Sequence, residues 1–164
     1  MTEKPSWFWV PGWIAFPALV GLDLWTKNLA SARSPSLQVQ PLIPGLLNLT
    51  LVHNSGAAFG IGHRWSNPFF IVMSIVAMGV ILYLFAKLEK RERLARWALV
   101  LILAGALGNF IDRVRVGYVV DFIDVYFRSH HWWTFNLADS FITVGAILFG
   151  LDMLLKSKRK EPAA

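Results

Sequence analysis

Two aspartates, Asp121 and Asp139, are the residues of this chain best suited to chemistry. Asp139 opens the last long apolar run, and an ionisable side chain costs roughly 2.5–3.5 kcal/mol to insert near the centre of a bilayer. Such an acid needs water, a partner or a chemical role. Asp121 lies upstream, in the connection that leads to this run. Two carboxyl groups on one side of a membrane can form an acid/base pair that activates water.

The two carboxyl groups should share a proton if Asp121 folds back towards Asp139, because neighbouring like charges do not both ionise cheaply. The dipole of the last helix favours Asp139 as the ionised partner. A plain helix cap is the alternative role for Asp139. Asp124 leaves the choice of the upstream acid open. A helix would put Asp121 and Asp124 on one face, whereas a strand would separate them.

Polar residues also mark the outer ends of two other apolar runs. Asp23 and Lys27 stand four residues apart and can pair on one helical face. Asn109, Asp112 and Arg113 share a face in the same way, and an Arg and an Asn there can hold a carboxylate or a substrate carbonyl. In each place a structural ion pair is the alternative, between Asp23 and Lys27 or between Asp112 and Arg113.

Composition excludes an ordinary soluble domain. The chain has 164 residues, of which 55% are hydrophobic and 16% charged, and its mean hydropathy is +0.50. We expect one integral membrane domain over residues 1–164. The basic residues behind the net charge of +6 gather beside apolar runs, so we expect no nucleic-acid partner. The absence of cysteine and the spacing of the four histidines indicate neither a metal nor a cofactor site.

The apolar runs predict a membrane α-helical protein with four transmembrane helices, at about residues 7–27, 68–86, 97–113 and 136–156. A retained first helix is favoured over a cleaved signal peptide, because its apolar part is too long and is followed by Asp23 and Lys27. Most basic residues lie at the two termini and in the loop 87–96. This distribution predicts that both termini are cytoplasmic and that the polar residues face outward.

The segment of about residues 34–66 predicts a small extracytoplasmic β region. Within it, Leu47–Leu51 alternates apolar and polar residues, which indicates a half-buried strand. The small residues after Asn54, beginning with Gly56, predict a turn in which backbone can approach another group closely. The connection 114–135 carries the aromatic residues typical of a membrane surface, so we expect an interfacial segment there.

Five blocks of residues together resemble bacterial lipoprotein signal peptidase, also called signal peptidase II. The blocks are Asp23-x-x-x-Lys27, Asn54-Ser55-Gly56-Ala57-Ala58-Phe59, Gly108-Asn109-x-x-Asp112-Arg113, Val119-Val120-Asp121-Phe122 and Phe135-Asn136-Leu137-Ala138-Asp139-Ser140. They occur in order and span nearly the whole chain. Together they are therefore far more specific than any single block.

The resemblance implies a metal-independent aspartyl endopeptidase of the bacterial inner membrane, with its active site at the periplasmic face. Its substrate would be a prolipoprotein with a diacylglyceryl-modified cysteine, cut on the amino side of that cysteine. Membrane lipid would be its other partner, with no cofactor and no obligate protein partner. The resemblance also implies an outward β platform around residues 37–60 and an interfacial lid or helix within residues 114–133.

Residue by residue, the resemblance assigns the catalytic pair to Asp121 and Asp139, and it selects Asp121 over Asp124 by analogy alone. The supporting positions carry over onto Asp23, Lys27, Asn54, Gly56, Gly108, Asn109, Arg113 and Asn136.

Two rival functions remain from the residues alone. A proton-coupled transporter would place its acids near the membrane midplane with access from both faces, whereas these acids cluster at one end. A serine peptidase would use Ser55 with His53, His63 or His130, although nothing in the sequence orients a histidine towards that serine.

Overall fold

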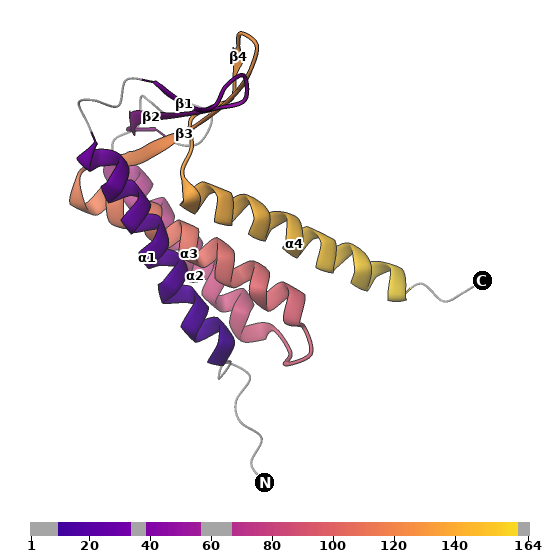
Figure 1. Cartoon of the computed structure of the whole chain (residues 1–164). Coiled ribbons are helices and arrows are strands. Elements are labelled where there is room, and N and C mark those ends of the chain that lie inside the picture. The colour runs from indigo at the N-terminus through magenta and orange to yellow at the C-terminus, as the bar shows by residue number, and fades with distance from the viewer. Residues whose placement is uncertain (1–9, 34–38, 57–66, 161–164) are drawn as a thin grey trace.

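A sheet projects from one end of a group of helices (Figure 1). The computed structural model describes residues 10–33, 39–56 and 67–160. The elements follow in the order α1 Val10–Ala32, β1 Gln40–Ile43, β2 Leu47–Asn54, α2 Asn67–Lys87, α3 Arg93–Arg115, β3 Val119–Phe127, β4 His130–His131 and α4 Leu137–Lys160. The predicted start of the first helix at about residue 7 and the segment 57–66 lie outside the described residues.

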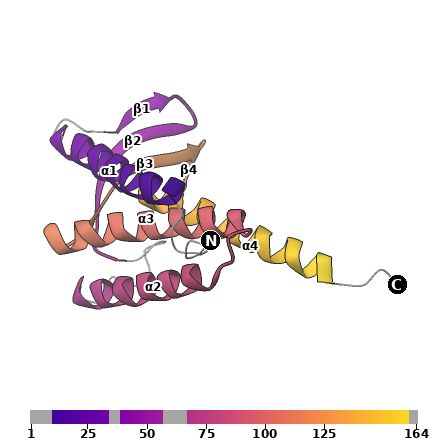
Figure 2. The same ribbon diagram turned by 90° about the horizontal axis from the view of Figure 1, so that it is seen from below.

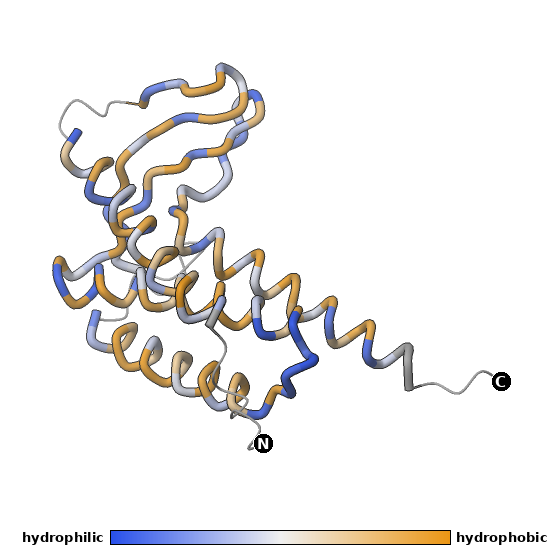
Figure 3. The backbone as a smooth tube through the Cα atoms, turned by 60° about the horizontal axis from the view of Figure 1, so that its bottom comes forward, coloured by the Kyte–Doolittle hydropathy of each residue, from blue (hydrophilic) through white to orange (hydrophobic). Residues whose placement is uncertain are grey.

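The four predicted helices are present. Within the described residues, α2, α3 and α4 are long and apolar enough to cross a membrane. The polar residues Asp23 and Lys27 lower the hydropathy of α1, so a fourth span at α1 and the orientation of the termini stay predictions. Figure 3 shows hydrophobic residues along the helices and hydrophilic ones in the loop between α2 and α3.

The loop between α2 and α3 is shorter than the sequence predicted. Helix α3 begins at Arg93, so Arg96 lies inside the helix and not in the loop. Arg96 is buried, and its guanidinium donates hydrogen bonds to the carbonyl oxygens of Glu89 and Leu88, 3.0 and 2.9 Å away. These carbonyl groups, which lie just after the end of α2, accept the hydrogen bonds of the guanidinium, and a buried basic residue is therefore tolerated there.

The far end of α4 is tied to the same loop. Lys156 of α4 pairs with both Glu92 and Asp152. The hydrogen bond from Lys156 lowers the pKa of Glu92, which stands at the N-terminus of α3 outside the membrane-spanning segments.

The strands form one antiparallel arrangement in the order β1-β2-β3-β4. The predicted half-buried strand is confirmed as β2, and Val52 and Asn54 of β2 lie opposite Asp121 and Val119 of β3. Two predictions need correction here. The sheet is not confined to residues 34–66, and residues 119–127 form a strand in place of an interfacial lid or helix. The valines and aromatic residues of this segment favour a strand that can pair with β2.

Helix α3 is the centre of the helical part, with α1, α2 and α4 around it (Figure 2). Two glycines allow α3 and α4 to approach closely. A Cβ atom on Gly105 would lie 2.2 Å from the carbonyl oxygen of Ala138, and one on Gly145 would lie 2.7 Å from that of Ala98. Because backbone cannot move aside as a side chain can, glycine is required at both positions. This contact fixes the start of α4 on α3.

Candidate active site

Strand β3 directs Asp121 and Asp124 to opposite sides, as residues three apart in a strand must be. Asp121 faces the start of α4. Asp124 accepts a hydrogen bond from Asn48 Nδ2 at 2.9 Å and lies 2.9 Å from Nδ1 of His131. The sequence left open whether a helix or a strand carries Asp121 and Asp124, and the structure shows a strand. Of these two acids, only Asp121 lies in the polar cluster at the start of α4.

Asn136 contacts both aspartates of the predicted pair. Its Nδ2 donates a hydrogen bond to Asp121 Oδ1 at 2.7 Å. Its backbone N–H donates to Asp139 Oδ2 at 3.2 Å, while its Oδ1 accepts from the backbone N–H of Asp139 at 3.0 Å. The last two bonds form a reciprocal cap at the start of α4. Asp139 therefore does act as a helix cap. The same contacts direct its carboxylate towards Asn136, which also hydrogen-bonds Asp121.

Asp121 is almost completely buried, whereas Asp139 is only half-buried. Asn54 Nδ2 donates a hydrogen bond to Asp121 Oδ2 at 2.9 Å. Burial, followed by the charge of Asp139, raises the pKa of Asp121 to about 7, although the hydrogen bonds from Asn54 and Asn136 act in the opposite direction. Asp121 therefore holds a proton for part of the time at neutral pH.

Asn109 orients Asp139 from the side of α3. Its Nδ2 donates a hydrogen bond to Asp139 Oδ1 at 2.8 Å. Its Oδ1 accepts from Lys27 Nζ at 2.8 Å and from Asn136 Nδ2 at 3.2 Å. Because an ammonium group only donates, Lys27 fixes which end of the Asn109 amide faces Asp139.

Lys27 is the buried cation beneath this pair. Besides Asn109, its Nζ lies 3.0 Å from Asp23 Oδ2 and 3.0 Å from Asp112 Oδ2. The structural pairing of Asp23 with Lys27 is thus confirmed, and Asp112 also pairs with Lys27. Both carboxylates and the lysine are buried, so each depends on the others for compensation of its charge.

Asp23 fastens α1 to the start of α4. Its Oδ1 accepts a hydrogen bond from the backbone N–H of Ala138 at 2.9 Å, next to Asp139. Its Oδ2 is buried without a hydrogen bond of good geometry and contacts Lys27 as an ion pair. A Cβ atom on Gly108 would lie 2.3 Å from that oxygen. Gly108 therefore provides the space in which Asp23 reaches α4.

Arg113 connects the helical part to the end of β2. Its Nη2 donates a hydrogen bond to the carbonyl oxygen of Gly56 at 2.9 Å, and its guanidinium lies 5.2 Å from the centre of the Phe70 ring. The N–H of Gly56 in turn donates to Asn54 Oδ1 at 2.9 Å. Arg113 thereby holds Gly56, which in turn orients Asn54. The positive charge of Arg113 also interacts with the carboxyl groups of Asp139 and Asp121.

No supporting role was predicted for Asp112, although the structure places it in the same network. Its Oδ2 accepts a hydrogen bond from the backbone N–H of Val120 at 3.2 Å, and the carbonyl oxygen of Val120 accepts from Asn136 Nδ2 at 3.3 Å. Both backbone polar groups of Val120, the residue before Asp121, are therefore held by this network. The spacing of Asp112 three residues after Asn109 was the signal that could have identified it.

The structure brings all ten predicted site residues into one connected network. They are Asp23, Lys27, Asn54, Gly56, Gly108, Asn109, Arg113, Asp121, Asn136 and Asp139. The network joins α1, β2, α3, β3 and α4 where the sheet meets the helices. The catalytic roles of its members stay predictions.

This fold is that of a bacterial membrane enzyme. A solved bacterial membrane enzyme, determined by the in meso method, superposes with a TM-score of 0.87 at 34% sequence identity, covering 96% of this chain and 95% of that one. A second structure of the same description gives a TM-score of 0.78 at 35% identity, covering 90% of this chain and 94% of the other.

The sequence comparisons specify the family. The model of the family described as signal peptidase (SPase) II matches residues 15–155, and the chain belongs to this family. The lipoprotein signal peptidase of Geobacter sulfurreducens is 48% identical over 143 residues, which cover 86% of this chain and 89% of the relative. That of Acinetobacter baumannii is 40% identical over 152 residues, covering 90% of this chain and 86% of the relative. The resemblance seen in the five sequence blocks is confirmed.

Proposed function

We propose that this protein is an aspartic endopeptidase that removes the signal peptide from diacylglyceryl-modified prolipoproteins, cutting on the amino side of the lipidated cysteine. Its membership of the signal peptidase II family and the names of its relatives support a protease that acts on lipoprotein signal peptides. The two-aspartate mechanism rests on one observation. Asn136 hydrogen-bonds the carboxyl groups of both Asp121 and Asp139.

The surroundings of the two carboxyl groups suit different roles. Asp139 accepts hydrogen bonds from Asn109 and Asn136, which hold its carboxyl group in place at the start of α4. Asp121 is buried, with its pKa raised to about 7, so it can keep a proton near neutral pH. Asp139 would remove a proton from the attacking water while Asp121 protonates the leaving amine.

The place of the pair fits a lipid-anchored substrate. A diacylglyceryl group holds its cysteine at the membrane surface, so the scissile bond stays near the interface. The polar network lies where the sheet meets the ends of α1 and α3 and the start of α4 (Figure 1). We place this end at the periplasmic face of the bacterial inner membrane, with the chain as a multi-pass protein that needs no obligate protein partner.

The described contacts of His53 and His131 do not support the serine-peptidase alternative, and His63 lies outside the described residues. His53 stacks on Tyr118, with the ring centres 4.2 Å apart, and Ser55 is exposed beside it. His131 lies against Asp124, on the side of β3 away from Asp121. The acids of the network sit at one end of the helices, which is unlike the midplane site of a transporter.

The purified chain should cleave a lipidated precursor between the signal peptide and the modified cysteine, as measured by mass spectrometry of both products. The matched control is the same precursor with that cysteine replaced by serine, which cannot carry the lipid and should stay intact. EDTA should leave the rate unchanged. Cleavage of the serine precursor at an equal rate, or an EDTA-sensitive rate restored by a metal ion, would refute the proposal.

Processing should slow as the pH rises through about 7. A carboxyl group with a raised pKa is protonated below that pKa and loses its proton above it, so the acid form of Asp121 disappears in the alkaline direction. Well above pH 7, kcat/KM should fall by about tenfold per pH unit. Initial rates measured from about pH 5 to about pH 9 test this, and a rate that keeps rising beyond pH 8 would contradict it.

A further inference from the structure

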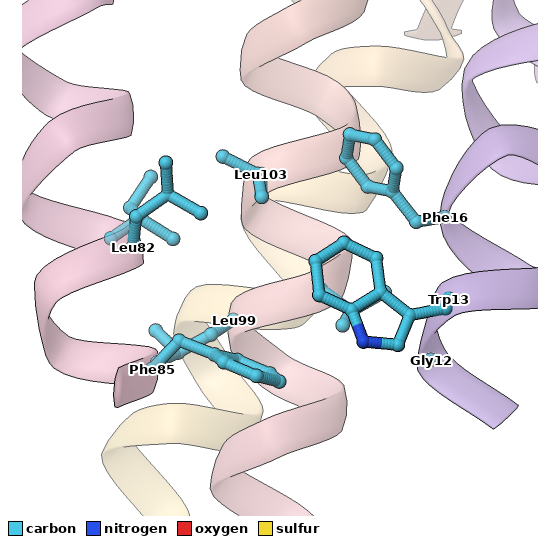
Figure 4. A pocket seen from close by; sticks show the side chains of 9 residues that line it. Gly12, Trp13, Phe16, Leu82, Phe85, Leu99 and Leu103 are labelled. Atoms are coloured by element: carbon cyan, nitrogen blue, oxygen red, sulfur yellow. The ribbon is translucent and has the colours of Figure 1, made fainter. Parts of the chain in front are cut away.

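A groove lined by aliphatic and aromatic residues lies between α1 and α2, with α3 as its floor (Figure 4). Trp13 and Phe16 enter it from α1, and Leu82 and Phe85 from α2. Its cavity volume is about 30 Å³. A space of this size admits the ends of single apolar side chains and is too narrow for a lipid headgroup.

The groove lies below the candidate active site on the same face of α1. The residues Trp13, Phe16, Val20, Asp23 and Lys27 alternate spacings of three and four, which places them on one helical face. Val20, Asp23 and Lys27 of this set are buried. With a rise of about 1.5 Å per residue, Phe16 lies roughly 10 Å and Trp13 roughly 15 Å along the helix from Asp23.

A substrate held at the acid pair has to continue through the membrane. The signal-peptide side of the scissile bond is an apolar segment, and within the hydrocarbon it must be helical to satisfy its backbone hydrogen bonds. With its N-terminus on the same side as that of α1, this helix runs parallel to α1. Asp23 lies at the depth of the pair, because it hydrogen-bonds the backbone next to Asp139. The part of the signal helix level with the groove is therefore about 7–10 residues before the cut.

We infer that the groove between α1 and α2 binds the apolar helix of the precursor's signal peptide, through one or two side chains about 7–10 residues before the scissile bond. Side chains of one helix that insert between those of its neighbours are the usual basis of helix packing. The inference deepens the proposed function and rests on it. Because the lining is apolar apart from the indole N–H of Trp13, recognition here depends on the size and apolarity of the inserted side chains and tolerates variation in sequence.

Filling the groove should weaken substrate binding without affecting the chemistry. Leu82→Trp places a larger ring at the lip of the groove, and we expect KM for the lipidated precursor to rise about tenfold with kcat unchanged. Val80→Trp is the matched control, because Val80 is equally exposed, at 51% against 50% for Leu82, but does not line the groove. Two residues along a helix lie about 200° apart, so this ring faces away, and KM should stay the same.

Photo-crosslinking gives a second readout that does not depend on turnover. A photoreactive amino acid at position 82 should crosslink to the signal peptide of the lipidated precursor, and the same group at position 80 should not. Crosslinks from position 82 to phospholipid alone, while the chain still cleaves the precursor, would overturn the inference and make a membrane acyl chain the occupant. Equal KM values for Leu82→Trp and Val80→Trp would overturn it as well. Failure of the proposed function is distinguishable, because the unaltered chain would then not cleave the precursor.

Discussion

Asp121→Asn and Asp139→Asn should each slow processing of a lipidated precursor by about 10²–10⁴-fold, the range typical of positioned acid and base groups. An amide cannot take the proton that Asp139 is proposed to accept, nor supply the one that Asp121 is proposed to donate. Single-turnover rates with excess purified protein measure the chemical step directly. Because the two groups act as one pair, the double variant should be about as slow as either single variant, and not slower by the product of their effects.

Asp124→Asn is the matched control for these variants. Asp124 lies in the same strand, and its carboxylate accepts a hydrogen bond from Asn48 just as that of Asp121 accepts one from Asn54. Its replacement imposes a similar loss of a hydrogen bond on β3 while leaving the acid pair intact. Activity should stay near that of the parent protein. Full activity in Asp139→Asn, or a dead Asp124→Asn protein that remains folded by circular dichroism, would assign the chemistry to other residues.

The site could be predicted from the sequence to a large extent because membrane insertion makes buried charge conspicuous. Asp23, Lys27 and Asn109 stand out in otherwise apolar helices, and helical spacing alone put the first two on one face. Their meeting place was also predictable, because each falls near the outer end of its run. The structure confirms this with the contacts of Lys27 to both residues.

The sheet was harder to predict because its strands are distant in sequence. Residues 47–51 carry the alternation of a half-buried strand, but the partner of this strand lies in residues 119–127, where burial on both sides removes the alternation. Aromatic residues near that segment suggested a membrane surface instead. Without the pairing, the choice between Asp121 and Asp124 rested on family analogy, and Asp112 had no visible contact with β3.

The charges of the network support a proton on the acid pair. Four carboxyl groups belong to it, those of Asp23, Asp112, Asp121 and Asp139, and the cations among its described members are Lys27 and Arg113. Full ionisation would leave excess negative charge in a mostly buried place, which is costly. Lys27 lies against Asp23 and Asp112. Asp121, whose pKa is raised to about 7, is therefore where a proton best relieves the excess.

The geometry of the acid pair depends on the close contact between α3 and α4, and Gly105→Ala should disrupt that contact. The added Cβ would lie 2.2 Å from the carbonyl oxygen of Ala138, so the start of α4 has to move away. We expect a loss of about 1–3 kcal/mol in stability from overpacking. The same movement displaces Asn136 and Asp139, and a displacement of about 1 Å can reduce the rate about 10²-fold.

Gly79→Ala in α2 is the control for this substitution, because a Cβ atom there meets nothing within 4 Å. It should keep full activity and gain up to about 1 kcal/mol from the higher helix propensity of alanine. Thermal inactivation in detergent measures the stability of both variants, and precursor processing measures the site. If Gly105→Ala matched Gly79→Ala in both assays, the start of α4 would not be fixed by this contact. The loss expected for Gly105→Ala would instead show that the missing methyl group of Gly105 allows the contact with Ala138 that fixes the start of α4.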